Sequence, residues 1–360
     1  MSGIAATGLP GAPRRVAVLG AGAVGTLLGG LLASTGADVV LLDPRVAPDA
    51  GDEIVIHEPD GRRVEARIAR TTAPAELAAA PDLAVLAVKT FDIEAALDDL
   101  RAWPGTPVLT IQNGVGAEEL VAAARPGVGH VAGSLTAPVE RPGANEVRWR
   151  GRGGIGLAPV AGSVGNLVDE LVGAFTAAGL PARRLGDARA MKWSKLVANL
   201  VGNALSALAD RDPGEIYADP ALFDLERRQL LEALAVMRAQ GIGVIALPGA
   251  NVPLLAVGVR LPAPLSRRVL GRVVGGARGG KSPSLRLHLR GGASGPSEVA
   301  WLNGAVARAG VLHGVPTPVN DALTSLVDAA TADPELAASL AAEPARIVDL
   351  VARSPRRPTR

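Results

Sequence analysis

The pattern of apolar positions divides the chain into a first part rich in short strands and a second part rich in helices. Short continuous apolar runs predict buried strands at 15–19, 38–42, 82–88 and 108–111. A hairpin is predicted at 53–68, and more strands at 130–158, with a turn at Arg141-Pro142-Gly143. Helices are predicted between these strands at 24–35, 93–100 and 164–178.

From residue 187 onward helices dominate the pattern, at 187–209, 220–240, 296–309, 318–330 and 334–352. We therefore predict an α/β protein, with an N-terminal Rossmann-like doubly wound sheet followed by a mainly α-helical C-terminal domain. The predicted boundaries are a disordered leader at 1–14, a nucleotide-binding domain at 15–186, a helical substrate domain at 187–352 and a basic disordered tail at 353–360.

One predicted helix carries polar residues in apolar surroundings. Within 191–208, Lys195, Asn199 and Asn203 recur at positions i, i+4 and i+8, which lie on one face of a helix. Burying an amide without a partner costs about 2–7 kcal/mol, so this stripe must meet other polar groups. Two interpretations remain open at this point: a polar contact between helices, or a pocket for a small oxygen-rich substrate.

A glycine-rich motif, GAGAVG at 20–25, follows the first predicted strand and opens the next helix. The second strand ends at Asp43, which completes the layout of a dinucleotide-binding unit. Gly20 allows the turn, Gly22 leaves room for a pyrophosphate, and Gly25 allows close packing of helix and strand. The alternative is a tight turn that binds nothing. The predicted cofactor contacts are Gly20, Gly22, Ala23, Val24, Gly25, Asp43, Arg45, Lys89 and Asn113.

The residues after the predicted strands bear on the choice and the position of the cofactor. Asp43 favours NAD, because an acid there repels a 2′-phosphate, whereas Arg45 favours NADP. Lys89 and Asn113 each follow a predicted parallel strand, so they are expected at the same sheet edge as Gly22. The alternatives are a solvated lysine at a strand end and an Asn-Gly turn.

Composition excludes several other classes of protein. A net charge of +2 and only eight aromatic residues argue against nucleic-acid binding. The chain has no cysteine, which excludes thiolate chemistry and fits a cytoplasmic protein, and its four scattered histidines predict no metal site. The uncharged run at 16–37 contains six glycines, so we expect a strand, turn and helix there rather than a membrane span. The apolar segment 242–272 is a candidate homodimer surface or lid.

Taken together, the motifs of the chain resemble those of the ketopantoate reductases, also called 2-dehydropantoate 2-reductases. The resemblance spans about 15–327 and includes the motifs GAGAVG, VKTFD, IQNGVG, KWSKLVANLVGNALSAL, KSPSL, SEVAWLNGAV and HGVPTPVNDAL. It implies NADPH-dependent reduction of 2-dehydropantoate to (R)-pantoate, a step toward pantothenate and coenzyme A.

The resemblance also implies roles for individual residues. Lys195 corresponds to the general acid, a cation suited to stabilising a developing alkoxide and protonating it. Glu298 corresponds to a carboxylate that binds the substrate hydroxyl, and Lys89 to a residue near the nicotinamide. Without the resemblance, Ser284 reads as a helix cap and Glu298 as a first-turn helix acid. The implied substrate contacts are Asn113, Asn199, Asn203 and Ser284.

Two departures from the family pattern concern the substrate. Relatives often carry an acid four residues after the loop serine, where this chain has His288, and the segment 291–295 before Glu298 is slightly long. Two alternatives therefore remain: a related reductase of another branched 2-oxo acid, and a nucleotide-binding sensor without catalysis.

Overall fold

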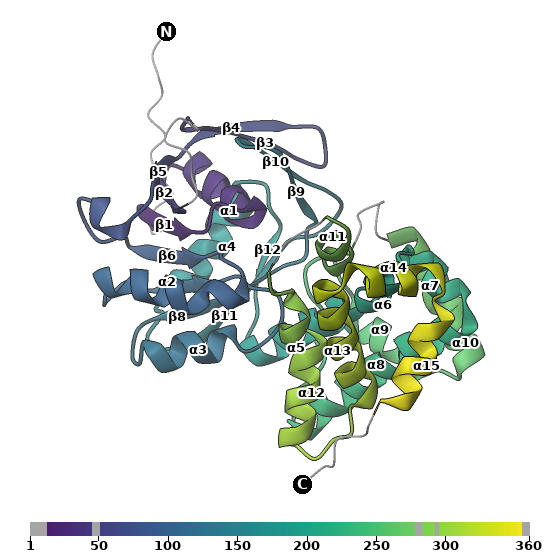
Figure 1. Cartoon of the computed structure of the whole chain (residues 1–360). Helices are drawn as coiled ribbons and strands as arrows, with labels where there is room; N and C mark the ends of the chain where they lie inside the picture. The colour runs from purple at the N-terminus through teal and green to yellow at the C-terminus, as the bar shows by residue number, and fades with distance from the viewer. Residues whose placement is uncertain (1–12, 45–50, 278–282, 292–294, 355–360) are drawn as a thin grey trace. The chain divides into compact units, whose positions relative to one another are not determined.

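The structure is a computed structural model that describes residues 13–44, 51–277, 283–291 and 295–354 of the 360 (Figure 1). The predicted disordered leader and basic tail lie almost entirely outside the described residues, and so does Arg45. The chain forms two compact units. We call them the sheet unit, which comprises Met1–Gln112, Ala117–Met191 and Leu247–Ala250, and the helical unit, which comprises Asn113–Gly116, Lys192–Ala246 and Asn251–Arg360.

The sheet unit contains an eight-stranded sheet in the order β12-β11-β8-β7-β6-β1-β2-β5. Neighbouring strands are parallel except β8 and β11, which are antiparallel. The predicted fold class, a doubly wound sheet followed by a helical region, is confirmed. The strands are β1 Arg15–Leu19, β2 Asp38–Leu42, β5 Ala69–Thr71, β6 Leu83–Leu86, β7 Val108–Thr110, β8 His130–Leu135, β11 Ile155–Ala161 and β12 Ala182–Arg184.

A second, four-stranded sheet packs on helix α1 (Ala23–Ser34) in the order β4-β3-β10-β9. The predicted hairpin at 53–68 is confirmed as β3 (Glu53–His57) and β4 (Arg63–Arg67). The turn predicted at Arg141-Pro142-Gly143 is wrong, because these residues end β9 (Val139–Gly143). The chain reverses instead at 144–145, before β10 (Glu146–Trp149). Pro142 is tolerated because β9 is an edge strand, where a missing N–H breaks no ladder.

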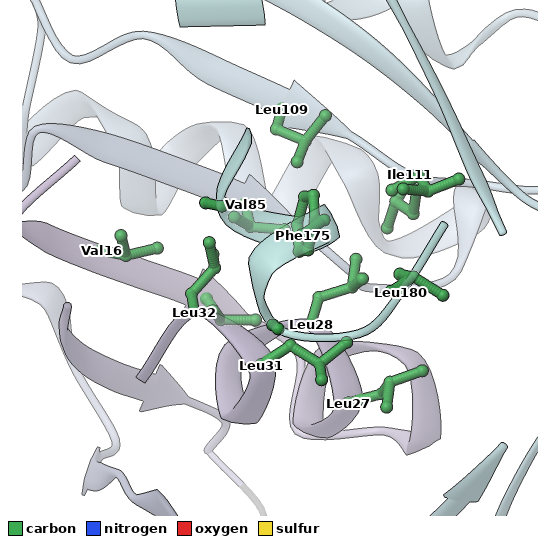
Figure 2. Close-up of a cluster of buried hydrophobic side chains, with 14 of the residues drawn as sticks. Val16, Leu27, Leu28, Leu31, Leu32, Val85, Leu109, Ile111, Phe175 and Leu180 are labelled. Carbon is green, nitrogen blue, oxygen red and sulfur yellow. The ribbon is translucent and has the colours of Figure 1, made fainter. Parts of the chain in front are cut away.

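Helix α1 lies against both sheets, and its sequence shows how. Gly30 faces the small sheet, where an added Cβ would lie only 2.7 Å from Cδ1 of Ile56. Four leucines of α1 are buried in a core that contains residues of both sheets, together with Phe175 of α4 (Leu167–Ala177), which is fully buried. The other helices of the unit are α2 (Ile93–Asp99) and α3 (Ala117–Ala124). Figure 2 shows this core, to which α1 contributes Leu27, Leu28, Leu31 and Leu32.

The helical unit is built from helices. Its elements are α5 Ala188–Leu200, which begins in the sheet unit, then α6 Ala204–Ala209, α7 Pro213–Ala218, α8 Pro220–Ala239, α9 Val252–Arg260, α10 Ala263–Ala277, α11 Ser284–Arg290, the 3₁₀ helix η4 Glu298–Trp301, α12 Asn303–Leu312, α13 Pro318–Ala332, α14 Pro334–Ala342 and α15 Ala345–Arg353. Proline opens α7, α8, α13 and α14, at the position where its missing N–H costs least.

Three of the predicted helices are each divided in two. The helix predicted at 296–309 consists of the 3₁₀ helix η4 and of α12, with Leu302 between them. The helix predicted at 334–352 ends at Ala342 and resumes at Ala345, with Pro344 between the two parts. The helix predicted at 187–209 stops after Leu200, because Gly202 adopts a left-handed conformation with φ +55°.

The segment 242–272, whose structure the sequence left open, contains α9 and most of α10. These helices expose the apolar side chains of Leu254, Val257, Leu265 and Val269. No helix in the described ranges is both long enough and apolar enough to cross a membrane.

We expect replacement of Phe175 by alanine to destabilise the protein by about 3–5 kcal/mol, because the surrounding core cannot close the cavity. Urea unfolding followed by circular dichroism measures this change. The matched control is Leu120→Ala on α3, where the side chain is 42% exposed and the expected change is within about 0.5 kcal/mol. Equal midpoints for the two variants would contradict the assignment of Phe175 to the core.

Candidate active site

The glycine-rich turn between β1 and α1 is tight at both ends and open in the middle. Gly20 has φ +104°, and an added Cβ would lie 2.8 Å from the backbone nitrogen of Val88. At Gly25 an added Cβ would lie 2.0 Å from the carbonyl oxygen of Gly20. At Gly22, the N-cap residue of α1, no atom lies within 4 Å of an added Cβ. The turn therefore leaves space beside a helix N-terminus, where a phosphate group binds favourably.

Two predicted cofactor residues follow strands that flank β1 in the main sheet. Asp43 follows β2, is 6% exposed, and accepts a hydrogen bond from the backbone N–H of Ala21 to Oδ2 (3.2 Å). Lys89 lies beyond the end of β6 and is exposed. Because β6, β1 and β2 are parallel neighbours, both residues lie at the sheet edge that carries the glycine turn.

Gln112 holds the ends of two strands together, a role that sequence reasoning missed. Its Nε2 donates to the carbonyl oxygens of Leu86 (2.7 Å) and Val88 (3.1 Å). Its Oε1 accepts from the backbone N–H of Ile111 (3.1 Å). An amide that follows an apolar strand directly was the only signal for this role in the sequence.

Asn113, the next residue, belongs with 114–116 to the helical unit. The backbone N–H of Val115 donates to the carbonyl oxygen of Trp301 (3.3 Å). Gly114 has φ +85°, and an added Cβ would lie 2.2 Å from the same oxygen, so only glycine fits there. Asn113 follows the carboxyl end of β7 (Val108–Thr110), and the contacts of its segment are made with η4.

The helical unit brings together polar residues that lie far apart in the sequence. Asn199 of α5 donates from Nδ2 to Oδ1 of Asn113 (3.1 Å), and Lys195 lies one turn earlier on the same helix, half-buried. Asn203 donates from Nδ2 to Oγ of Ser284 (3.5 Å), and its Oδ1 accepts from the backbone N–H of Leu285 (3.1 Å). Hydrogen bonds thus join two pairs of the predicted substrate residues.

The prediction that Lys195, Asn199 and Asn203 lie on one face of a single helix is wrong for Asn203. Because Gly202 breaks the helix, Asn203 is the N-cap residue of α6 and not the third turn of one helix face. It is 5% exposed and faces the start of α11, which explains its bonds to Ser284 and Leu285.

The remaining predicted residue, Glu298, is half-buried at the first position of η4. Ser297 precedes it and caps this short helix by accepting from the N–H of Val299 (3.3 Å). On α11, His288 lies one turn after Ser284, and its Nε2 is buried without a hydrogen-bond partner among the described residues. In the same ranges, no group of three histidine, aspartate or glutamate side chains is placed to hold a metal ion.

A buried carboxylate binds the backbone at the point where α5 ends and before α6 begins. Oε1 of Glu226 on α8 accepts from the N–H of Gly202 (2.5 Å) and from the hydroxyl of Tyr217 (3.2 Å). Its Oε2 accepts from Nε2 of Gln229 (2.6 Å), whose Oε1 accepts from Nδ2 of Asn303 on α12 (2.7 Å). Sequence reasoning missed this network, although Glu226 falls on the apolar face of a helix, which is the pattern of a buried polar residue.

Comparisons with known proteins converge on one family. A family model described as ketopantoate reductase PanE/ApbA matches residues 16–162, and the model of its C-terminal part matches residues 187–331. The 2-dehydropantoate 2-reductase of Halobacterium salinarum is 30% identical over 325 residues, which cover 89% of this chain and 99% of that protein. The enzyme of the same name from Mesorhizobium japonicum is 30% identical over 340 residues, covering 87% and 96%.

Solved structures agree with these sequence matches. The crystal structure of 2-dehydropantoate 2-reductase from Geobacter metallireducens aligns with a TM-score of 0.72 at 27% identity and covers 88% of this chain and 100% of that one. A D-mandelate dehydrogenase, solved with NADH and anilino(oxo)acetate, aligns with a TM-score of 0.72 at 22% identity, covering 89% and 99%. This second similarity shows a common fold only.

We expect Glu226→Ala to destabilise the protein, at a cost of about 1–3 kcal/mol for each buried donor left without an acceptor. Amide hydrogen exchange at 202–205 should become faster, because the N–H of Gly202 loses its partner. Glu226→Gln keeps one acceptor oxygen, so its loss of stability should be smaller.

The exposed Glu343→Ala is the control for this network. Urea unfolding measures stability, and mass-spectrometric hydrogen exchange measures the local effect. An unchanged exchange rate at 202–205 in the Glu226→Ala variant would show that the carboxylate does not stabilise the backbone between α5 and α6.

Proposed function

This chain belongs to the ketopantoate reductase family, and on that premise we propose that it reduces 2-dehydropantoate to (R)-pantoate with NADPH. Members of this family are oxidoreductases that act on a 2-oxo acid with a nicotinamide cofactor. The observation that carries the proposal is the pairing of Asn113 with Asn199 and of Asn203 with Ser284 in the helical unit. By the resemblance of the motifs, these four residues fall on positions that contact the substrate.

Lys195 is the proposed general acid. The cofactor, when bound, supplies the hydride for the carbonyl carbon of the 2-oxo acid. The ammonium group of Lys195 stabilises the negative charge that develops on the carbonyl oxygen, and it then donates its proton to that oxygen. The lysine leaves the step neutral and regains its proton from water.

The remaining polar residues orient the substrate in this proposal. Glu298 accepts a hydrogen bond from the substrate hydroxyl. The amides of Asn113, Asn199 and Asn203 supply donors and acceptors for the carboxylate and carbonyl groups, and Ser284 adds a hydroxyl. Amides and hydroxyls suit this role because each can donate or accept.

The glycine turn suits a dinucleotide, because it is open at Gly22 beside the N-terminus of α1. We propose NADPH as the cofactor, with Lys89 near the nicotinamide. Asp43, whose position favours NAD, accepts a hydrogen bond from the backbone N–H of Ala21. The complete absence of cysteine supports a cytoplasmic location.

One observation favours a second substrate. His288 lies one turn from Ser284 with a buried Nε2, at a position where the resemblance to the family leads us to expect an acid. A different side chain beside the substrate loop favours reduction of another branched 2-oxo acid by the same chemistry.

We expect the purified protein to oxidise NADPH in the presence of 2-dehydropantoate. A spectrophotometric assay at 340 nm with NADPH and NADH, over a small panel of branched 2-oxo acids, measures the preference through kcat/KM. Higher kcat/KM for another acid would select the second substrate. Absence of turnover with every acid would favour a nucleotide-binding sensor.

Lys195→Ala should lower kcat by about 10²–10⁴, the usual contribution of general acid catalysis, while the dissociation constant of NADPH stays unchanged. Lys195→Arg is the matched variant, because arginine keeps the positive charge but does not release a proton at accessible pH. If Lys195 donates the proton, the arginine variant recovers only part of the rate. If kcat of the Lys195→Ala variant falls by less than about tenfold, Lys195 is not the general acid.

A further inference from the structure

Two arginines of the sheet unit reach the same turn from different sheets. Arg141 of β9 donates from Nη2 to the carbonyl oxygen of Ala144 (2.6 Å). Arg70 of β5 donates from Nη2 to Oδ1 of Asn145 (2.7 Å) and from Nε to the carbonyl oxygen of Gly51 (3.0 Å). Residues 144–145 form the turn between β9 and β10, so both guanidinium groups bind the same two-residue turn.

This turn adjoins the nucleotide end of the main sheet. Arg141 also donates from Nη1 to the carbonyl oxygen of Ala21 (2.6 Å), inside the glycine turn. The N–H of the same Ala21 donates to Asp43. Arg70 pairs in the sheet with Leu41, the residue before the end of β2. In dinucleotide-binding units the end of the second strand lies beside the adenosine ribose, at its 2′ position.

The electrostatics of the two arginines favour an anion. Burial lowers the pKa of Arg70, the positive charge of Arg141 lowers it further, and the weaker influence of the Asp52 carboxylate, which raises it, does not offset them. Among the residues that the structure describes, no carboxylate lies within ion-pair distance of either guanidinium, and the oxygens that they bind are neutral. Two like charges are thus held close together, and a phosphate group between them would relieve their repulsion. The planar guanidinium fork matches the geometry of phosphate oxygens.

We propose that Arg70 and Arg141 bind the 2′-phosphate of NADPH. Selectivity for this cofactor then comes from β5 and from the β9–β10 end of the small sheet, not only from the residues that follow β2. The proposal rests on the proposed function in so far as the cofactor is NADPH. It also accounts for an NADP enzyme that carries an acid at Asp43, because two cations nearby offset the repulsion between that acid and the phosphate.

The alternative is a structural role, in which the two guanidinium groups only fix the turn. A structural role would affect every nucleotide alike. NADPH and NADH differ only in the 2′-phosphate, so a comparison of their affinities separates the two roles.

The experiment is a calorimetric titration of the full chain with NADPH and with NADH, without any 2-oxo acid. The variants are Arg70→Gln, Arg141→Gln and the double variant. The matched control is Arg63→Gln, an exposed arginine on β4 of the small sheet, which pairs with Glu65 (3.1 Å). Each single variant should weaken NADPH binding about tenfold or more, the loss expected for a hydrogen bond to a charged group, and should leave NADH binding within about twofold.

The double variant should bind the two cofactors equally, and the control should keep the wild-type preference. An equal loss for NADPH and NADH in the arginine variants overturns the proposal, and so does no loss at all. Equal affinity of the wild-type chain for NADH and NADPH also overturns the phosphate site. If that chain reduces a 2-oxo acid with NADH, the proposed reductase function still stands. A chain that reduces none of the acids but shows the predicted change in selectivity still supports the phosphate site.

Discussion

The hydrogen bond between the N–H of Gly202 and the carboxylate of Glu226 is the interaction on which the helical unit depends. A left-handed glycine ends α5 and leaves backbone groups without helical partners, and burial makes unsatisfied groups costly. Glu226 supplies an acceptor from α8, and through Gln229 it connects the break to α12. Because α5 ends at this point, Asn203 becomes the N-cap residue of a new helix and bonds to Ser284.

A comparable constraint acts in the sheet unit, where α1 has a sheet on each side. The helix buries its leucines in a core shared by the two sheets and brings Gly30 close to Ile56 of the small sheet. Its entry is equally confined, because neither Gly20 nor Gly25 has room for a Cβ atom. The backbone N–H groups at the start of α1 are therefore fixed before any ligand arrives. Such preorganisation lowers the ordering cost of binding.

Local signals in the sequence predicted most of the fold. Apolar runs located the central strands, and the spacing of glycines located the turn into α1, because both patterns act over a few residues. The break at Gly202 escaped prediction, since a glycine inside a helix costs only about 1 kcal/mol and distant contacts decide whether the helix continues. The turn after β9 was misplaced for a similar reason. Pro142 resembles a turn residue, but an edge strand accepts it.

The candidate site was less predictable from residues alone. The pairs Asn113 with Asn199 and Asn203 with Ser284 join residues separated by 86 and 81 positions, and helix periodicity carries no information over such distances. These residues were identified as a set by resemblance to a family. Glu226 and Gln112 belong to no motif that the sequence offered, because their roles depend on which backbone groups the fold leaves without partners.

The placement of 113–116 has a consequence for how the protein is built. These four residues leave the strand end that Gln112 holds, join η4 of the helical unit, and return to α3 of the sheet unit. Neither unit is a single contiguous stretch of chain, so no single cleavage of the backbone would release a whole one. During synthesis, residues 113–116 emerge from the ribosome long before η4, so their contacts with Trp301 form only after η4 has been made.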